Sequence, residues 1–317
     1  MANTRNILIS GGTGFIGKYL VNKHICNGDK VFVFSRKKIK SDVINLQYIK
    51  FDLQDLDNKK KFERYFRDAD IFYHLAAETT NEEIMFETNV MLTKKFLNFA
   101  LMSNLKWVQL SSVGVYGYRY DGIISEKTSE CPSSLYEITK TIADKLLIDA
   151  SLEKSLDLVI LRPSNVYGET MKNKSLFQLI NQIKQGLFFF VGPKGASANY
   201  VHVDDVTNAL IACAETSFNS YKIFNLSNWD SFENMVYKIC QEFDRPKIRL
   251  RIPFKIIYIG AKIISLFSKT ILTPSRVLAL SSRAIYSNDL ITQELNFKPE
   301  ISVQSGISRL IKAWHKN

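Results

Sequence analysis

Three glycines spaced three residues apart follow a short apolar stretch near the start of the chain. The stretch is Ile7-Leu8-Ile9, and the glycines are Gly11, Gly14 and Gly17. Because glycine has no Cβ, a turn of this kind can approach a phosphate closely and begin a helix whose first N–H groups face the negative charge. The pattern predicts a strand, a nucleotide-binding turn and a helix. A tight turn without a ligand is the alternative.

Short apolar runs alternate with longer helical patterns through the first half of the chain. Runs with few polar residues are typical of strands buried on both faces of a parallel sheet. We expect an α/β fold with a doubly wound parallel sheet, in which ligands bind at the carboxyl ends of the strands. The expected strands are Asn6–Ser10, Lys30–Ser35, Gln47–Phe51, Ile71–Leu75, Trp107–Ser111 and Leu158–Leu161.

The pattern is less regular after Gly168. We expect a helix over Ser175–Gly186, a loop over Gly192–Asn199, and a stretch Tyr200–Val206 that leads into a further helix. The predicted division is a dinucleotide-binding domain of residues 1–168 and 200–226 and a smaller C-terminal substrate-binding lobe of residues 169–199 and 227–317.

Length and cysteine content indicate a globular protein of 317 residues without a metal site. The four cysteines lie far apart and lack the paired spacing of a metal clamp. The first expected strand follows Met1 so closely that a secretory signal has no room, and a cytoplasmic location is expected.

Positive charge is concentrated in residues 245–288, here called the basic segment. It holds nine lysines and arginines and no acidic residue, in a chain of net charge +11. Such a concentration indicates an anionic small molecule or a peripheral membrane contact, and nucleic acid is not expected. A solvated basic face without a partner is the alternative.

Residues 252–272 within the basic segment are apolar and have the length of a helix. Lysines at positions 255, 262 and 269 fall on one stripe, and the apolar runs between them are too short to span a bilayer. A mostly buried lid helix over the substrate cleft and a helix lying in a membrane interface both fit this pattern.

Ser112, Tyr136 and Lys140 form the second strong signal. Ser112 follows an expected strand, whereas Tyr136 and Lys140 lie four residues apart and so share one face of a helix. An adjacent ammonium favours the ionised form of a tyrosine, which brings its pKa closer to neutral pH. The three side chains suit proton transfer to a substrate oxygen held by the Ser112 hydroxyl.

These residues resemble the extended branch of the short-chain dehydrogenase/reductase superfamily, which contains nucleotide-sugar epimerases, dehydratases and reductases. The resemblance covers nearly the whole chain and follows the order of that family's motifs. The matching segments are Gly11-Gly12-Thr13-Gly14-Phe15-Ile16-Gly17, Phe51-Asp52-Leu53, His74-Leu75-Ala76-Ala77, Ser112 with Tyr136 and Lys140, Leu161 to Gly168, Tyr200 to Val206, and Glu294 to Pro299.

The resemblance implies a catalytic triad of Ser112, Tyr136 and Lys140, and a bound NAD or NADP. The remaining residues that it implies for the cofactor are Gly11, Thr13, Gly14, Phe15, Ile16, Gly17, Ser35, Arg36, Asp52, Leu53, Ala76, Ala77, Asn89 and Pro163. Beside Ser112 and Tyr136, it implies Asn165 for the substrate. Arg276 or Arg283 could supply positive charge in place of the arginine that many epimerases of the family carry just before Tyr200. The resemblance also implies a homodimer formed by paired helices.

The residues at the end of the second expected strand favour NADP. An acidic residue there would bind the ribose 2′-hydroxyl, whereas arginine accommodates a 2′-phosphate, and this chain has Ser35 and Arg36.

Two departures from the family pattern bear on the reaction. Ser112 is followed by Val113 and Gly114 in place of the Asp-Glu pair of sugar dehydratases, and Asn199 stands where many epimerases have an arginine before Tyr200. We expect reduction of a keto-sugar nucleotide. The alternatives are a nucleotide-sugar 4-epimerase, a 3β-hydroxysteroid dehydrogenase-like or flavonol reductase-like ketoreductase, and a non-catalytic NADP-binding scaffold at a membrane.

Overall fold

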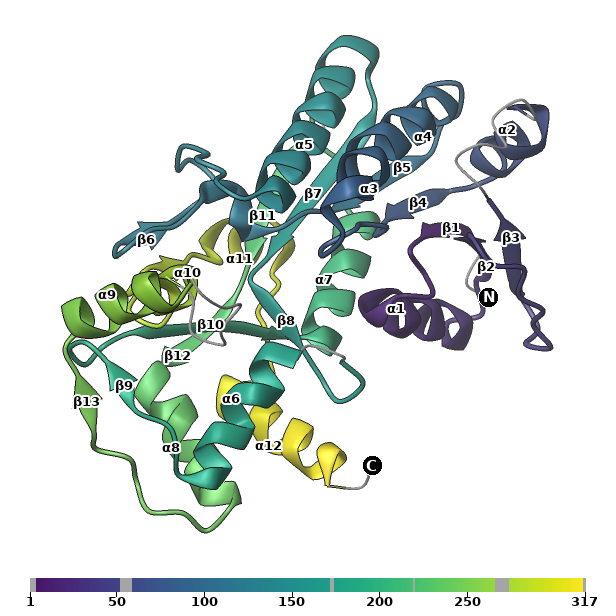
Figure 1. Ribbon diagram of the computed structural model, residues 1–317. Helices are drawn as coiled ribbons and strands as arrows, with labels where there is room; N and C mark the ends of the chain where they lie inside the picture. Colours follow the sequence, from purple (N-terminus) through teal and green to yellow (C-terminus); the bar gives the residue numbers. More distant parts are fainter. Residues whose placement is uncertain (1–3, 52–58, 172–173, 219, 266–273, 316–317) are drawn as a thin grey trace.

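Seven parallel strands form the central sheet of the computed structural model, which describes residues 4–51, 59–171, 174–218, 220–265 and 274–315. Their order is β11-β7-β5-β4-β1-β2-β3, and each neighbouring pair runs parallel (Figure 1). The strands are β1 (Asn6–Ser10), β2 (Lys30–Ser35), β3 (Leu46–Lys50), β4 (Ile71–His74), β5 (Lys106–Leu110), β7 (Asp157–Pro163) and β11 (Lys222–Leu226). The strand order reverses beside β1, which is the point at which doubly wound sheets bind ligands.

Helices cover both faces of this sheet, as Figure 1 shows. One face packs against α2, α4 and α5 in a cluster that includes Phe66, Phe96 and Leu147, and the other packs against α1 and α7 in a cluster that includes Leu20 and Leu210. The helices of this part are α1 (Phe15–Cys26), α2 (Lys59–Arg67), α3 (Glu82–Phe86), the π-helical turn η2 (Glu87–Met91), α4 (Leu92–Ala100), the 3-10 turn η3 (Val113–Tyr116), α5 (Leu135–Lys154) and α7 (Val203–Glu215). The predicted α/β fold with a doubly wound parallel sheet is confirmed.

All six predicted strands are present with their ends shifted by at most two residues, but the seventh, β11, was missed. Its sequence interrupts the apolar pattern with Asn225, which is fully buried and accepts a hydrogen bond from the Tyr116 hydroxyl at 2.9 Å. A buried strand that contains a polar residue lacks a continuous apolar run. It is therefore not recognised when the hydrogen-bond partner of that residue lies far away in the sequence.

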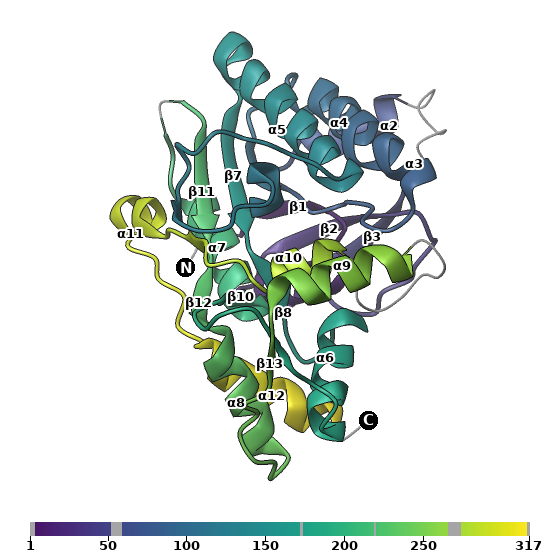
Figure 2. The same ribbon diagram turned by 60° about the vertical axis from the view of Figure 1, so that its left-hand side comes forward.

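The smaller part of the molecule packs around α6, α8 and α12, which Figure 2 shows grouped together away from α2, α4 and α5. The predicted helix over 175–186 is confirmed as α6. The remaining elements are β6 (Ile123–Ile124), β8 (Asn165–Tyr167), α6 (Lys174–Gln185), β9 (Phe190–Val191), β10 (Ser197–His202), β12 (Asn228–Ser231), α8 (Phe232–Glu242), β13 (Arg251–Ile252), α9 (Phe254–Ser265), α10 (Pro274–Ala279), β14 (Ile285–Tyr286), α11 (Asp289–Leu295) and α12 (Val303–Trp314).

The loop predicted over Gly192–Asn199 is wrong at its C-terminal end. Ser197–Asn199 begin β10, which pairs antiparallel with β12 and parallel with β8. The backbone N–H of Ser197 also donates to the carbonyl of Ser282, a partner that local sequence does not reveal. The division of the chain into two domains stays a prediction.

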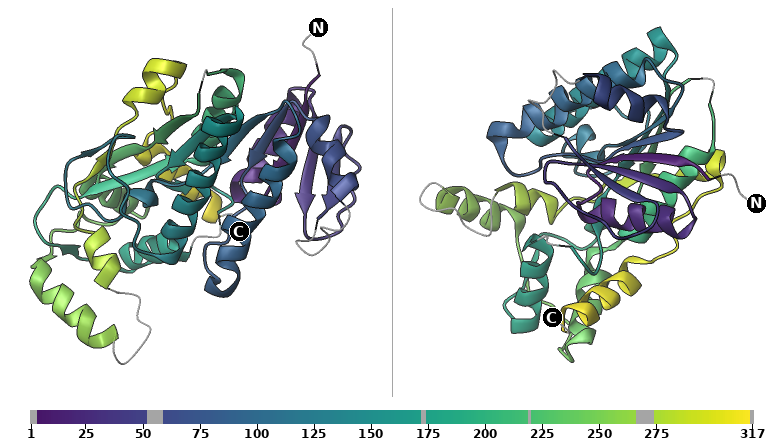
Figure 3. Two further views of the ribbon diagram at one scale, coloured as in Figure 1. Left: turned by 90° about the horizontal axis from the view of Figure 1, so that it is seen from above. Right: turned by 90° about the vertical axis from the view of Figure 1, so that its right-hand side faces the viewer.

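Helix α9 projects from one side of the molecule, as both views of Figure 3 show. Its inner face packs Phe254, Ile257 and Ala261 against Val191 and Val277. Ile256 and Ile259, in contrast, are 62% and 57% exposed. The alternative of a mostly buried lid helix is therefore wrong for the described part of this stretch, and Lys269 lies outside the described residues.

Across the parts of the chain that the structure describes, the helices are all too short or too polar to cross a membrane.

Candidate active site

The glycine-rich turn after β1 accepts nothing larger than glycine at two positions. Gly11 has φ +74°, and a Cβ there would lie 2.6 Å from the backbone nitrogen of Ala76. A Cβ on Gly17 would lie 2.2 Å from the carbonyl oxygen of Gly11. The turn thus packs directly against the end of β4 and the start of α1, which is the close backbone approach that a phosphate turn requires.

The N-terminus of α1 opens onto this turn without a side-chain cap. The N-cap residue is Gly14, which has no side chain that could cap the helix. The N–H of Gly14 donates a hydrogen bond to the carbonyl of Gly11 at 2.9 Å and so closes the turn. The first N–H groups of a helix have no partner within the helix, and with the helix dipole they favour an anion at this place. The turn therefore fits the pyrophosphate of a dinucleotide.

A cavity of about 250 Å³ lies beside this turn at the carboxyl ends of β1, β2 and β4. Seven of the predicted cofactor residues line it, namely Gly11, Thr13, Gly14, Ser35, Arg36, Ala76 and Ala77. The lining also includes Phe51 and Leu75, which lie in two of the matching segments. It further includes residues that the sequence did not indicate, namely Ser10, Phe34, Glu78, Thr88, Leu92 and Phe96. Apolar walls with a polar turn and an exposed arginine at the edge suit an adenosine with its ribose and phosphates.

The other predicted cofactor residues that the structure describes do not line this cavity. Phe15, Ile16 and Gly17 form the first turn of α1, and Pro163 ends β7. Asp52 and Leu53 lie outside the described residues.

Asn89 holds the loop after β4 in place from the π-helical turn η2. Its side-chain oxygen accepts from the N–H of Glu78 at 2.7 Å, and its amide donates to the carbonyl of Glu78 at 3.0 Å and to the Thr139 hydroxyl at 3.0 Å. The side chain thus joins the cavity wall to helix α5, so its position is that of a support.

Glu78 is a cavity residue that the sequence reading missed. Its carboxylate accepts from the backbone N–H groups of Thr79, Thr80 and Asn81. These hydrogen bonds lower the pKa of Glu78 to about 2, so the loop is held by an ionised carboxylate. A glutamate followed by Thr-Thr-Asn is the only local signal that could have indicated this turn.

His74 ties the ends of β1 and β4 together. Its ring nitrogens bond the Ser10 hydroxyl at 2.5 Å and the Thr93 hydroxyl at 2.9 Å. Burial lowers the pKa of His74 to about 3, so the ring is neutral at physiological pH. This histidine therefore fixes the floor of the cavity and does not act as an acid.

Ser112, Tyr136 and Lys140 meet at the carboxyl end of β5. Ser112 caps η3 through a hydrogen bond from the N–H of Gly114 at 3.0 Å, and its side chain also bonds the Tyr136 hydroxyl. Lys140 lies one turn further along α5, and its ammonium donates to the carbonyl of Leu110 at 2.6 Å. The structure thus brings the three predicted residues together.

A capping box fixes where α5 begins and hence where Tyr136 lies. The Ser134 side chain accepts from the N–H of Glu137, and the Glu137 side chain accepts from the N–H of Ser134. Such reciprocal bonds satisfy two N–H groups that a helix start otherwise leaves open.

Burial disfavours charge on both titratable members of the group. It raises the pKa of Tyr136 to about 12, and a hydrogen bond from Ser112 acts against that rise. It lowers the pKa of Lys140 to about 8, and the carboxylate of Asp144 acts against that fall. A tyrosine in this state is a proton donor, which suits the protonation of a developing alkoxide.

The predicted substrate residues lie on the smaller part of the molecule. Asn165 donates to the carbonyl of Asn199 at 3.0 Å, and Arg276 donates to the Ser175 hydroxyl at 3.2 Å. Arg283 donates to the carbonyl of Lys194 at 2.7 Å. Their assignment to a substrate stays a prediction.

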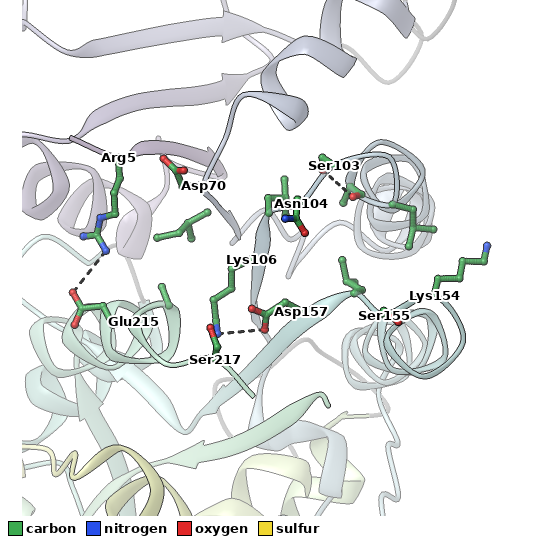
Figure 4. Close-up of a pocket in the computed structure, with 16 residues that line it drawn as sticks. Arg5, Asp70, Ser103, Asn104, Lys106, Lys154, Ser155, Asp157, Glu215 and Ser217 are labelled. Atoms are coloured by element: carbon green, nitrogen blue, oxygen red, sulfur yellow. Dashed lines mark hydrogen bonds and ion pairs between the residues drawn. The ribbon is translucent and has the colours of Figure 1, made fainter. Parts of the chain in front are cut away.

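A larger cavity, of about 560 Å³, lies at the opposite edge of the sheet (Figure 4). It is lined at the amino ends of the strands, where Lys106 pairs with Asp157 at 3.3 Å and Arg5 pairs with Glu215 at 3.8 Å. Charged groups that neutralise one another leave little attraction for a ligand.

The described part of the chain contains no group of three or more histidine, cysteine, aspartate or glutamate side chains arranged to hold a metal ion.

Comparison with known proteins gives one family. Residues 7–227 match the family model described as "NAD dependent epimerase/dehydratase family". The chain is 31% identical over 221 residues to the ADP-L-glycero-D-manno-heptose-6-epimerase of Brachyspira hyodysenteriae, a match that covers 64% of this chain and 70% of that protein.

Two solved structures show the same fold at lower identity. The UDP-glucuronic acid 4-epimerase of Bacillus cereus, in complex with UDP-glucuronic acid and NAD, has a TM-score of 0.76 at 19% identity and covers 98% of this chain and 100% of its own. The dTDP-glucose 4,6-dehydratase of Bacillus anthracis, in complex with NAD, has a TM-score of 0.77 at 20% identity, covering 99% of this chain and 97% of its own.

Proposed function

The chain belongs to the NAD-dependent epimerase/dehydratase family, and from this premise we propose that it reduces a keto-sugar nucleotide with a nicotinamide cofactor. The observation that carries the proposal is the meeting of Ser112, Tyr136 and Lys140 at the carboxyl end of β5, on the edge of the sheet that also holds the glycine turn. The relatives named above act on or bind sugar nucleotides, which supports the substrate class.

The roles of the three side chains follow from their surroundings. A nicotinamide cofactor would supply the hydride for the carbonyl carbon. Tyr136 gives its hydroxyl proton to the substrate oxygen, and Ser112 donates a hydrogen bond that holds this oxygen beside it. Lys140, one helical turn further along α5, would supply positive charge for the phenolate left behind.

We propose NADP as the preferred form of the cofactor. Ser35 is buried at the end of β2, and Arg36 is exposed beside it on the rim of the cavity. A guanidinium at this place can bind a 2′-phosphate through two hydrogen bonds. The solved relatives contain NAD, so the preference rests on these two residues alone.

A nucleotide-sugar 4-epimerase is the second candidate. It is favoured because two of the relatives named above are epimerases. An epimerase regenerates its own cofactor, whereas a reductase consumes NADPH in proportion to product. Dehydration is disfavoured, because Val113 and Gly114 occupy the positions after Ser112 where dehydratases carry two carboxylates. A steroid- or flavonol-type ketoreductase and a non-catalytic NADP-binding scaffold are two further candidates.

The test is a screen of nucleotide sugars and keto-sugars with NADPH or NADH. The reaction is monitored by the absorbance of the cofactor and by identification of the product. We expect Tyr136→Phe to lower turnover by about 10²- to 10⁴-fold with cofactor binding kept, and Tyr120→Phe, at an exposed tyrosine, to have no effect. Turnover without net NADPH consumption would replace the reductase by the epimerase. Unchanged turnover in Tyr136→Phe would contradict both.

We propose that the basic segment makes a peripheral contact with an anionic membrane through α9. The outer face of α9 carries exposed Ile256 and Ile259 between exposed Lys255 and Lys262. Apolar side chains flanked by lysines suit the boundary between acyl chains and anionic head groups.

Cosedimentation with vesicles tests this contact. Binding to vesicles with anionic lipid should exceed binding to neutral vesicles, weaken with salt, and fall in Ile256→Ser with Ile259→Ser. Met102→Ser, at an exposed residue remote in the chain, is the control. Equal binding to both vesicle types, or none, would assign the positive charge to a soluble anion.

We also propose that the protein is cytoplasmic and that it forms a homodimer. Leu135, Ile138 and Ile142 form an exposed apolar row on α5, which packs beside α3 with its exposed Ile84 and Phe86. Such a face suits a second copy of the same helices. Sedimentation analysis should give a dimer for the wild type and a monomer for Ile138→Glu.

A further inference from the structure

Three buried ionisable side chains lie in a row behind Tyr136. Lys140 and Asp144 are one turn apart on α5, and Arg162 lies on the neighbouring strand β7. They are 3%, 1% and 1% exposed, respectively. Removing a charge from water is costly, so a buried charge persists only when its surroundings compensate it.

Asp144 is fixed by donors on one of its two carboxylate oxygens. Its Oδ2 accepts from the Ser111 hydroxyl at 2.7 Å and from Arg162 Nε and Nη2 at 3.1 and 3.0 Å. Its Oδ1 is buried and has no hydrogen-bond partner among the described residues. The carboxylate is thus rigidly placed and leaves one anionic oxygen that acts through space.

Arg162 is held from its far side as well. Its Nη1 donates to the Tyr116 hydroxyl at 3.2 Å, and its Nη2 also donates to the half-exposed carboxylate of Glu130. The charges alternate from Lys140 through Asp144 and Arg162 to Glu130. Arg162 pairs with both Asp144 and Glu130, Lys140 lies one helical turn from Asp144, and the row ends at solvent.

Lys140 is the member of the row that needs this support. Its ammonium has a hydrogen bond to the Leu110 carbonyl, but burial lowers its pKa to about 8, and Asp144 is the group that acts against this fall. His74 of β4 also faces Lys140, and it is neutral because burial lowers its pKa to about 3. Tyr136 and Arg162 are the other titratable groups that face Asp144.

The contacts of Asp144 favour its ionised form against the effect of burial. Burial raises the pKa of this carboxyl, while Arg162, Lys140 and the Ser111 hydroxyl act against the rise. Each of the two cations and three donated hydrogen bonds stabilises the carboxylate relative to its acid form.

We propose that Asp144, clamped by Arg162 and Ser111, is a positioning residue that keeps Lys140 charged beside Tyr136 at neutral pH. This inference rests on the proposed function only in taking Lys140 as the partner of Tyr136 and of the cofactor. The clamp also fixes Ser111, which directly precedes Ser112.

The titration of Lys140 tests the role of Asp144 without any substrate or cofactor. Nuclear magnetic resonance of protein with isotope-labelled lysine gives its midpoint, and the signal is assigned by its loss in Lys140→Arg. We expect a midpoint near pH 8 in the wild type and a fall of about 1 to 2 on the pH scale in Asp144→Asn, as a charge one helical turn away implies. An unchanged midpoint in folded Asp144→Asn overturns the proposal.

A matched control separates charge from stability. Asp205 is a second carboxylate that is only 2% exposed, and it accepts from the N–H groups of Glu300 and Ile301. Asp205→Asn should destabilise the protein and leave the Lys140 midpoint unchanged. Ser111→Ala removes one donor but keeps the charge of Asp144, and it should move the midpoint far less than Asp144→Asn.

A second variant covers the case in which Asp144→Asn does not fold because Arg162 is left without its main anion. Asp144→Asn combined with Arg162→Met removes both buried partners, which is far better tolerated than removing one. The Lys140 midpoint should fall in this protein too, and an unchanged midpoint contradicts the proposal.

Dinucleotide binding separates this proposal from the proposed function. The affinity for NADPH is measured by fluorescence from pH 6 to pH 10, and it should fall as the pH rises and Lys140 loses its proton. We expect this fall to begin at a lower pH in Asp144→Asn than in the wild type. If neither protein binds NADPH or NADH, the proposed function fails, while the lysine titration still decides the role of Asp144.

Discussion

The two edges of the central sheet differ in a way that cavity size does not reveal. The amino edge holds a cavity of about 560 Å³, and the carboxyl edge holds one of about 250 Å³. At the amino edge, Lys106 and Arg5 are paired with acidic side chains. At the carboxyl edge, the glycine turn presents the uncapped start of α1, and Ser112, Tyr136 and Lys140 meet nearby.

The difference lies in what the backbone offers at each edge. Parallel strands followed by helices place helix N-termini at their carboxyl ends, so N–H groups and positive dipole ends gather there. The amino edge receives the helix C-termini, and Lys106 and Arg5 there pair with Asp157 and Glu215. Strand direction is therefore a better guide to the site than volume.

The largest expected effect comes from filling the glycine turn. Gly17→Ala places a methyl group 2.2 Å from the Gly11 carbonyl oxygen, and the turn must open. We expect binding of NADPH to weaken about 100-fold, or about 2.8 kcal/mol, by fluorescence titration. Gly260→Ala on α9, where a Cβ meets nothing within 4 Å, is the control. Full binding by Gly17→Ala would remove the turn from the site.

The rim of the smaller cavity should set the choice of cofactor. Arg36→Asp replaces a guanidinium by a carboxylate that repels a 2′-phosphate and accepts from a 2′-hydroxyl. The ratio of the dissociation constants for NADPH and NADH should change about 30-fold toward NADH, roughly 2 kcal/mol. An unaltered ratio would show that this rim does not contact the ribose.

Acid should loosen the carboxyl edge through His74. Its folded pKa of about 3 lies below the ordinary value of 6.5, so the unfolded chain takes up a proton first and stability falls as the pH drops from about 6.5 toward 3. Between pH 7 and pH 5 the wild type should lose about 2 kcal/mol more than His74→Gln in urea unfolding. His315→Gln, at an exposed histidine, should behave like the wild type.

The smallest effect belongs to the amino edge. Lys106 is 7% exposed, and its ammonium donates to Asp157 and to the Thr216 carbonyl. Lys106→Met should cost about 1 kcal/mol of stability, since Asp157 keeps partial access to water. NADPH affinity should stay within about twofold of the wild type. A large loss of affinity would mean that the two edges are coupled.

Local spacing predicted the glycine turn, six strands and the grouping of Ser112 with Tyr136 and Lys140. Each of these depends on residues a few positions apart, or on strands whose carboxyl ends must share one edge. The roles of these residues in cofactor binding and catalysis stay predictions.

Features whose partners are distant in the sequence were missed. Strand β11 is marked by a buried Asn225 that needs Tyr116, and the clamp on Asp144 needs Arg162 from another element. Glu78 was missed because its carboxylate accepts from backbone N–H groups. Almost every residue type has such a group, so the sequence gives no sign of these bonds. The assignment of Arg276 and Arg283 to the substrate depends only on the arginine missing before Tyr200, for which either could compensate.

The late place of β11 in the chain has a consequence for synthesis on the ribosome. β7 emerges long before Lys222–Leu226, and until then its free side is an unpaired apolar edge that includes Leu158 and Leu161. Such an edge can recruit strands from other chains. A chain interrupted before residue 222 is therefore expected to aggregate, so correct assembly depends on translation continuing past this strand.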